Sequence, residues 1–226
     1  TGVQTCALPI SVVAIFVIVG SLISLYYTMV PRPPKINRAP FIGVGQVLGE
    51  ETAKLLSNRG RIVTIVADYH QNSESPMHDE LTEFLNTIKR IPAIEVQATE
   101  VVKVDEISMG GGMDNKTFES VVKKYPQASA LVFLVGLPTM EAQPPGELPD
   151  RRPLIIAVHG NGMGAKGFFE RHQADLVILP RMTPDNVGPT DPKTPRDWFA
   201  KYFEVYTTAN YKSDRKSTRL NSSHRT

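Results

Sequence analysis

Cysteine is almost absent from this chain of 226 residues, because Cys6 is the only one. A disulfide framework and a thiolate zinc site both need several cysteines, so the sequence excludes both. It also lacks a nucleophile-elbow serine motif, a phosphate-binding P-loop and a paired metal motif. These absences favour a protein that is not an enzyme and that carries no cofactor or metal, without deciding the question.

The two ends of the chain resemble translated sequencing-adapter DNA. The head reads TGVQTCALPI and the tail, from Asp214, reads DRKSTRLNSSH. One DNA string encodes the tail, and its reverse complement encodes the head. We therefore expect residues 1–10 and 214–226 to be artefacts and exclude them from fold reasoning. The natural part then has no cysteine, and we expect its C-terminal end to be truncated.

An excess of charge of one sign is also missing. The formal net charge of the chain is +2. The tail from Asp214 to Thr226 carries four basic residues and one acid, a net of +3, and the head is uncharged, so the natural part carries −1. A nearly neutral domain gives no electrostatic support for a nucleic-acid partner.

What the sequence does contain is one long apolar run, SVVAIFVIVGSLISLYYTMV, which covers residues 11–30 without a charge. About twenty apolar residues cross a bilayer core, so this run predicts a transmembrane helix that acts as a single-pass anchor. A cleaved signal peptide is the alternative. Residues 31–40 hold four prolines and predict a stiff, extended linker.

Residues 41–213 alternate between helical patterns and short β-branched runs, which are typical of strands covered on both faces. This alternation predicts an α/β domain with a doubly wound, mainly parallel five-stranded sheet, a Rossmann-like or flavodoxin-like three-layer sandwich. The predicted strands are Arg61–Tyr69, Ile94–Val104, Ala130–Gly136, Leu154–Val158 and Asp175–Leu179. Helices are predicted at 46–58, from Pro76 to the residues before Pro92, after Asp114, near 165–172, and from Pro195 with an aromatic stripe from Trp198 to Tyr206.

From Val44 to about Arg181 the order of these segments resembles the second lobe of type I periplasmic binding proteins, the sugar-binding and repressor-core superfamily. The matching segments are GQVLGEETAKLLSNRG, RIVTIVADY, DELTEFLNTIKRIPAIEV, YPQASALVFL and PLIIAVHGN followed by ADLVILPR. The resemblance implies an extracytoplasmic domain that binds a small, sugar-like ligand. A single lobe forms half of a cleft, so a partner lobe or a dimer mate would close it.

The chain departs from the family at three positions. The family commonly has an aspartate where His159 stands and an arginine near Glu80, and it has a polar residue near Leu179. The resemblance therefore implies a binding edge whose side chains differ from those of the sugar-binding members.

Ligands of open α/β sheets bind beyond the carboxyl ends of the strands. Asp68, Tyr69 and His70 follow the first predicted strand, and His159 and Asn161 follow the fourth. We predict that these five residues bind the ligand of a membrane-anchored substrate-binding or sensor module.

A glycine-rich loop supports a different function. Gly162, Gly164 and Gly167 form a G-x-G-x-x-G motif between a predicted strand and a helix, where glycines admit a pyrophosphate to the helix N-terminus. Arg181 follows the next strand and suits a 2′-phosphate. The alternative hypothesis is therefore an NAD(P)-dependent oxidoreductase, and a further one is a structural docking module that uses the aromatic stripe.

Overall fold

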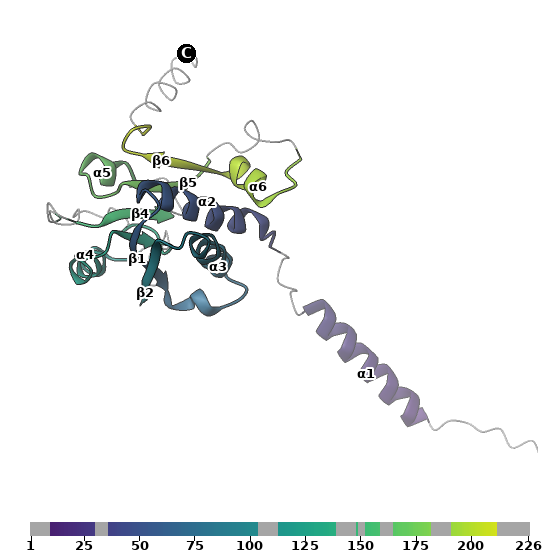
Figure 1. Ribbon diagram of the computed structural model, residues 1–226. Coiled ribbons are helices and arrows are strands. Elements are labelled where there is room, and N and C mark those ends of the chain that lie inside the picture. Colours follow the sequence, from purple (N-terminus) through teal and green to yellow (C-terminus); the bar gives the residue numbers. More distant parts are fainter. Residues whose placement is uncertain are drawn as a thin grey trace, which may run out of the picture. The chain divides into compact units, whose positions relative to one another are not determined.

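The computed structural model describes residues 10–29, 36–103, 113–138, 148, 152–158, 165–181 and 191–211 (Figure 1). The chain divides into two units, residues 1–37 and 38–226. Four candidate site residues lie outside the described residues, namely His159, Asn161, Gly162 and Gly164. Residues 1–9 and 214–226 also lie outside them, so their artefact origin stays a prediction.

The first unit contains one described element, the helix α1 (Ile10–Met29). Its hydroxyls turn back onto its own backbone, since Ser21 Oγ donates to the Val17 carbonyl at 2.8 Å. Within the described part of the chain, no helix is both long enough and apolar enough to be a membrane span. The transmembrane helix expected at 11–30 is therefore not confirmed.

The second unit is built on a mostly parallel sheet. Its described strands lie in the order β2-β1-β3-β4-β5-β6. They are β1 (Gly60–Ala67), β2 (Ile94–Val102), β3 (Ala130–Phe133), β4 (Leu154–Val158), β5 (Leu176–Pro180) and β6 (Phe203–Thr207). All neighbouring pairs are parallel except β5 and β6. The predicted α/β class and the mainly parallel sheet are confirmed.

The expected number of five strands is wrong, because the described residues add β6 as a sixth. The aromatic stripe from Trp198 to Tyr206 was assigned to one helix, but helix α6 (Pro195–Tyr202) ends before Phe203. There the backbone becomes extended, with φ −130° and ψ 162°, and Phe203 pairs with Pro180 of β5. The edge of β5 thus takes up the aromatic and β-branched residues that follow the helix.

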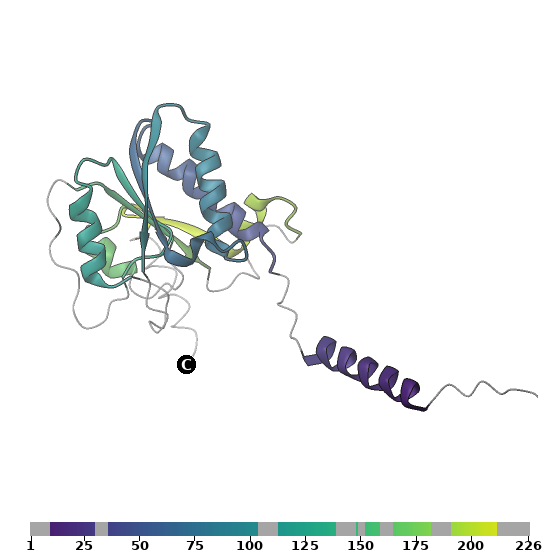
Figure 2. The same cartoon turned by 90° about the horizontal axis from the view of Figure 1, so that it is seen from below.

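Helices cover both faces of the sheet (Figure 2). On one face α4 and α5 lie together. The ring centroid of Phe118 in α4 lies 5.3 Å from that of Phe133 in β3 and 5.8 Å from that of Phe168 in α5. On the other face α2 packs against both α3 and α6. Their bounds are α2 (Ala39–Leu55), α3 (Pro76–Lys89), α4 (Asn115–Lys124) and α5 (Ala165–Glu170). The described residues therefore form the three layers that the sequence predicts.

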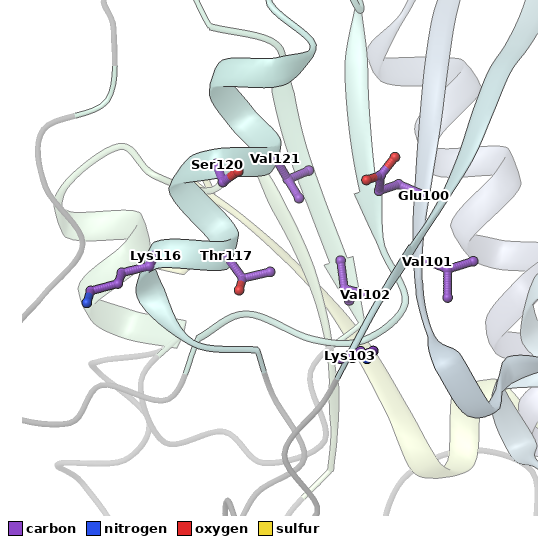
Figure 3. Close-up of a pocket in the computed structure, with 8 residues that line it drawn as sticks. All are labelled: Glu100, Val101, Val102, Lys103, Lys116, Thr117, Ser120 and Val121. Carbon is purple, nitrogen blue, oxygen red and sulfur yellow. The ribbon is translucent and has the colours of Figure 1, made fainter.

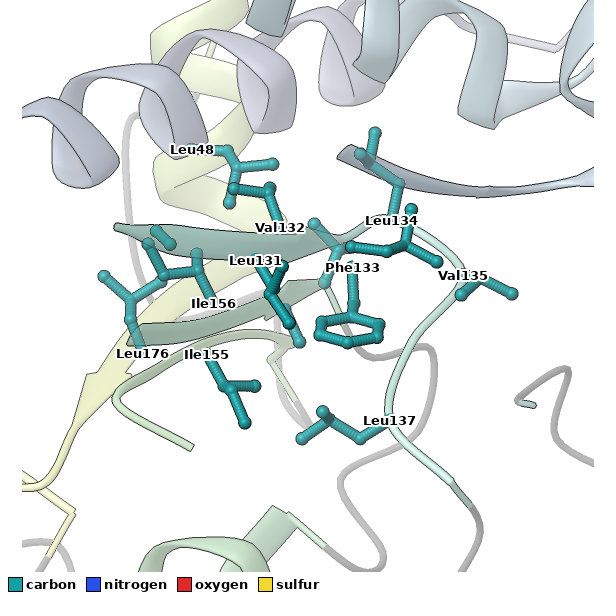
Figure 4. Close-up of a cluster of buried hydrophobic side chains, with 14 of the residues drawn as sticks. Leu48, Leu131, Val132, Phe133, Leu134, Val135, Leu137, Ile155, Ile156 and Leu176 are labelled. Carbon is teal, nitrogen blue, oxygen red and sulfur yellow. The ribbon is translucent and has the colours of Figure 1, made fainter. Parts of the chain in front are cut away.

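The core follows from the central strands, whose side chains are buried on both faces. In Figure 4 Val132 points toward Leu48 of α2, whereas Phe133 points to the opposite side with Leu137 and Ile155. All five side chains are completely buried. Burying each such side chain contributes about 1.5–3 kcal/mol, so this packing on both faces holds the central strands and their ends in place.

Helix α2 begins earlier than the sequence suggests, at Ala39 inside the predicted linker. Pro40 fits there because the first helical turn needs no amide donor. The helix also carries glycine where it crosses its neighbour, since a Cβ on Gly45 would lie 2.3 Å from the Glu80 carbonyl oxygen. Glycine at this position allows α2 to approach α3 closely.

Candidate functional site

The strand order points to one edge of the sheet as the candidate site. The chain leaves β1 through α3 to reach β2 on one side, and then crosses through α4 to reach β3 on the other side of β1. The connections therefore diverge between the carboxyl ends of β1 and β3. Open α/β sheets bind their ligands at this kind of switch point.

The residues directly after β1 form a short 3-10 turn, η1 (Asp68–Gln71). Asp68 and Tyr69 are exposed there, and His70 is half-buried. Met77 of α3 lies at the end of β1, where its sulfur accepts a hydrogen bond from the Ala67 amide at 3.4 Å. The structure thus brings three predicted site residues together at the switch point.

The side chains of this turn are partly fixed. His70 Nδ1 lies 2.8 Å from the Ala67 carbonyl, and this contact orients the ring and leaves Nε2 for another partner. Burial raises the pKa of the Tyr69 phenol, and the charges of Asp68 and Glu80 raise it further. At neutral pH the phenol is therefore protonated and able to donate a hydrogen bond.

Beside this turn lies the carboxyl group of Glu80, whose burial was not predicted from the sequence. Glu80 in α3 is only 7% exposed, and burial raises its pKa to about 8, with a smaller contribution from Asp79. From the sequence, Glu80 is named only as the position near which the resembling family has an arginine, and no burial is predicted there. A signal was present in the sequence, because Glu80 stands three residues after Met77 and four before Phe84, on the apolar face of the helix.

A groove of about 430 Å³ opens farther along the same edge, between the end of β2 and the first half of α4 (Figure 3). Glu100 in its wall is already paired, since it accepts from Lys124 Nζ at 2.7 Å and from the Tyr125 hydroxyl at 2.6 Å. These bonds, that of Lys124 first, lower the pKa of Glu100. Val102 also faces α4, whereas Val101 points away from it. Sequence reasoning gave no indication of this groove, because its two walls come from elements that only the fold brings together.

Arg181 has a different role from the one the cofactor hypothesis gave it. Its Nε donates to the carbonyls of Ala200 and Phe203 at 3.1 and 3.0 Å, and its Nη1 binds Glu204 at 2.9 Å. Three acceptors from α6 and β6 thus hold the guanidinium. This residue fastens the last strand to the sheet, and these contacts weaken the case that it receives a 2′-phosphate.

The other cofactor and metal features remain sparse. Gly167 lies inside helix α5, where its carbonyl accepts the Arg171 amide at 3.1 Å. The other glycines of the motif lie outside the described residues. In the ranges that the structure describes, no cluster of three or more histidine, aspartate or glutamate side chains is arranged to hold a metal ion.

No protein-family model and no curated protein sequence matches the chain. Solved structures do match. The fructose-binding periplasmic domain of a hybrid two-component system is 13% identical, with a TM-score of 0.55 over 81% of this chain and 62% of that one.

Two further solved structures give the same result. A carbohydrate transporter solute-binding protein from Agrobacterium radiobacter, in complex with D-arabinose, is 12% identical, with a TM-score of 0.53 over 79% of this chain. An arabinose-binding protein from Geobacillus stearothermophilus is 14% identical, with a TM-score of 0.51 over 76% of this chain. The domain has the type I periplasmic-binding-protein fold. The chain spans about 62% of the length of each of these type I binding proteins.

Proposed function

We propose that the domain binds a small polyhydroxy ligand of the sugar class at the carboxyl edge of its sheet. The observation that supports this most strongly is the polar turn of Asp68, Tyr69 and His70 at the switch point between β1 and β3. These side chains offer a carboxylate, a phenol and an imidazole, which hydrogen-bond sugar hydroxyls as acceptors and donors. Three solved proteins with this fold are described as binding fructose or arabinose.

The proposed site is half of a cleft. The turn after β1 is open, with Tyr69 45% exposed, whereas ligand pockets usually bury most of their ligand. A second lobe or a second copy of the chain would supply the other half. In the same proposal His159 and Asn161, after β4, contribute to the ligand contacts, and the domain works outside the cytoplasm as a substrate-binding or sensor module.

The experiment is a titration of the full chain with D-arabinose and D-fructose, followed by amide chemical shifts in NMR spectra. We expect the shifts to change at Asp68–Gln71. Asp68→Asn should weaken binding roughly tenfold or more, since a hydrogen bond to a charged group contributes about 1.5–3 kcal/mol. Glu95→Gln is the matched control, because Glu95 is exposed at the start of β2, at the opposite edge of the sheet.

Two results would contradict the proposal. One is a lack of shift changes with either sugar at millimolar concentration. The other is a set of changes confined to the amino ends of the strands, with equal binding by Asp68→Asn and Glu95→Gln.

A further inference from the structure

Glu80 is a buried acid without a counter-charge. The structure gives its carboxyl neither a hydrogen bond nor an ion pair within the described residues, although only 7% of the residue is exposed. Asp79, its neighbour in α3, binds Arg38 at 3.3 Å. Burial of a carboxyl without such a partner is costly, so side chains of this kind are rare unless they serve a function.

The carboxyl of Glu80 still reaches the surface. Some of the described side-chain oxygens have neither contact with solvent nor a hydrogen-bond partner, for example the hydroxyls of Thr52 and Thr87. The carboxyl oxygens of Glu80 also lack a hydrogen bond to the described residues, but they are not sealed from solvent in this way. Its small remaining exposure therefore includes the acid itself. The charge of Glu80 also raises the pKa of Tyr69, so the acid lies within electrostatic range of the turn after β1.

Among the residues that the structure describes, no cation of the surrounding elements pairs with Glu80. Strand β1 is uncharged from Ile62 to Ala67, and the turn after it brings Asp68, Tyr69 and His70. Helix α3 adds His78, Asp79 and Glu83. At the start of α2, Arg38 is held by Asp79 and by the Ser73 carbonyl at 2.6 Å. The groups around Glu80 therefore comprise three acids, two histidines and an arginine that is already held by Asp79 and Ser73.

We propose that Glu80 recognises a positively charged amino group on the ligand, and that the site prefers amino-bearing polyols to neutral ones. This inference rests on the proposed function, whose ligand class it narrows. A cation stabilises the ionised carboxyl, whereas a neutral hydroxyl leaves the buried charge uncompensated. Asp68, in the turn beside Glu80, also attracts a cation through its negative charge.

Such binding is linked to the loss of a proton. With a pKa of about 8, Glu80 is mostly protonated at pH 7 and about half ionised at pH 8. Because the apparent affinity scales with the fraction of protein in the competent state, binding of a cation should strengthen about fivefold over this step. The affinity for a neutral polyol should not increase between pH 7 and pH 8.

The test uses the full chain and two matched probes, 1-amino-1-deoxy-D-glucitol and D-glucitol, which differ only in one amino group. Calorimetric titrations at pH 7 and pH 8 measure both affinities. We expect the amino compound to bind at least about tenfold more tightly, an advantage of about 1.4 kcal/mol, and to release a proton in buffers of different ionisation enthalpy. Glu80→Gln should remove the preference, whereas Glu83→Gln, one turn closer to the end of the same helix, should retain it.

The outcomes separate the two proposals. Equal affinity for both probes, or a preference that survives in Glu80→Gln, overturns the role of Glu80. The binding edge itself still stands in that case if D-arabinose shifts Asp68–Gln71. If the amino compound binds and D-arabinose does not, the sugar class is wrong and the role of Glu80 stands. If Glu80→Gln does not fold by circular dichroism, proton release in the unmodified chain decides, and its absence overturns the inference.

Discussion

Two ionisable side chains at the carboxyl edge of the sheet have opposite surroundings. Arg181, after β5, gives its hydrogen bonds to two carbonyls and to Glu204. Glu80, beside the end of β1, is buried more deeply, and no cation in the described residues pairs with it. A charge whose partners lie in its own fold stabilises the structure, while a buried charge without one costs stability and remains available to a ligand. The binding function of this edge is therefore expected at β1.

The largest expected effect is the pH dependence that Glu80 confers on stability. Its pKa in the folded state is about 8, against an ordinary value of 4.5, so the folded state holds the proton more tightly. The stability that the protonated Glu80 side chain allows is fully present below the ordinary pKa of 4.5. It is lost as the pH rises from there through the folded-state pKa of about 8. The loss has an upper value of about 5 kcal/mol. Urea unfolding of the chain and of Glu80→Gln at pH 5 and pH 8 measures this difference.

We expect Glu80→Gln to unfold like the unmodified chain at pH 5 and to be clearly more stable at pH 8. Glu83→Gln controls for removal of a charge from the same helix. If the two Gln variants show the same pH profile, Glu80 is ionised or solvated in the folded protein, and the contrast with Arg181 disappears.

The next effect tests the other side of the comparison. Arg181→Ala leaves the acceptors in α6 and β6 without their donor, and the side chain is 22% exposed. We expect a loss of about 2–3 kcal/mol, together with faster hydrogen exchange in β6. Arg171→Ala, in the exposed turn after α5, should change the stability by less than about 0.5 kcal/mol. A loss of stability without faster exchange in β6 would mean that Arg181 does not fasten the last strand.

The sequence predicts the scaffold better than the site. The run after Arg61 is a strand signal because its residues are β-branched without interruption, and the run from Leu154 is continuously apolar. The cap at Asp114 is visible from its position before a helical pattern. Strand β6 was missed because stacked pairs such as Phe199 and Phe203 keep a helical spacing across the end of the helix. Only pairing with β5, a tertiary contact, makes Phe203 extended.

The candidate site shows the same division. Asp68, Tyr69 and His70 follow from the end of a strand, which local sequence reveals. The environment of Glu80 depends on α2, which precedes β1 in the chain and packs over α3. The spacing of Glu80 from Met77 and Phe84 places it on the apolar face of α3, and that much is a local pattern. The close approach of α2 to α3 at Gly45 is not visible in any local pattern.

That crossing gives a smaller effect. In Gly45→Ala the new Cβ would lie 2.3 Å from the Glu80 carbonyl oxygen, so α2 and α3 must separate. We expect a loss of about 1–3 kcal/mol, and the wider gap should let water reach Glu80 and lower its pKa toward the ordinary value. Carboxyl NMR titration checks the pKa. Lys54→Ala, on the exposed side of α2, is the control and should leave both quantities unchanged.

The smallest effect concerns Asp114, an acid at the same edge that is paired within its own helix. It caps α4, accepting the Thr117 amide at 2.8 Å and the Thr117 hydroxyl at 2.7 Å. These bonds, that of the hydroxyl first, lower the pKa of Asp114, so its stabilisation is present above the ordinary pKa of aspartate and is lost as the pH falls through the lowered value. Asp114→Ala should cost about 1 kcal/mol at pH 7, as measured by urea unfolding, and Asp114→Asn should keep most of it. If Asp114→Asn loses as much stability as Asp114→Ala, the charge of Asp114 stabilises the fold more than its hydrogen bonds do. Glu80 would then be the exception at this edge, as an acid whose charge destabilises the fold.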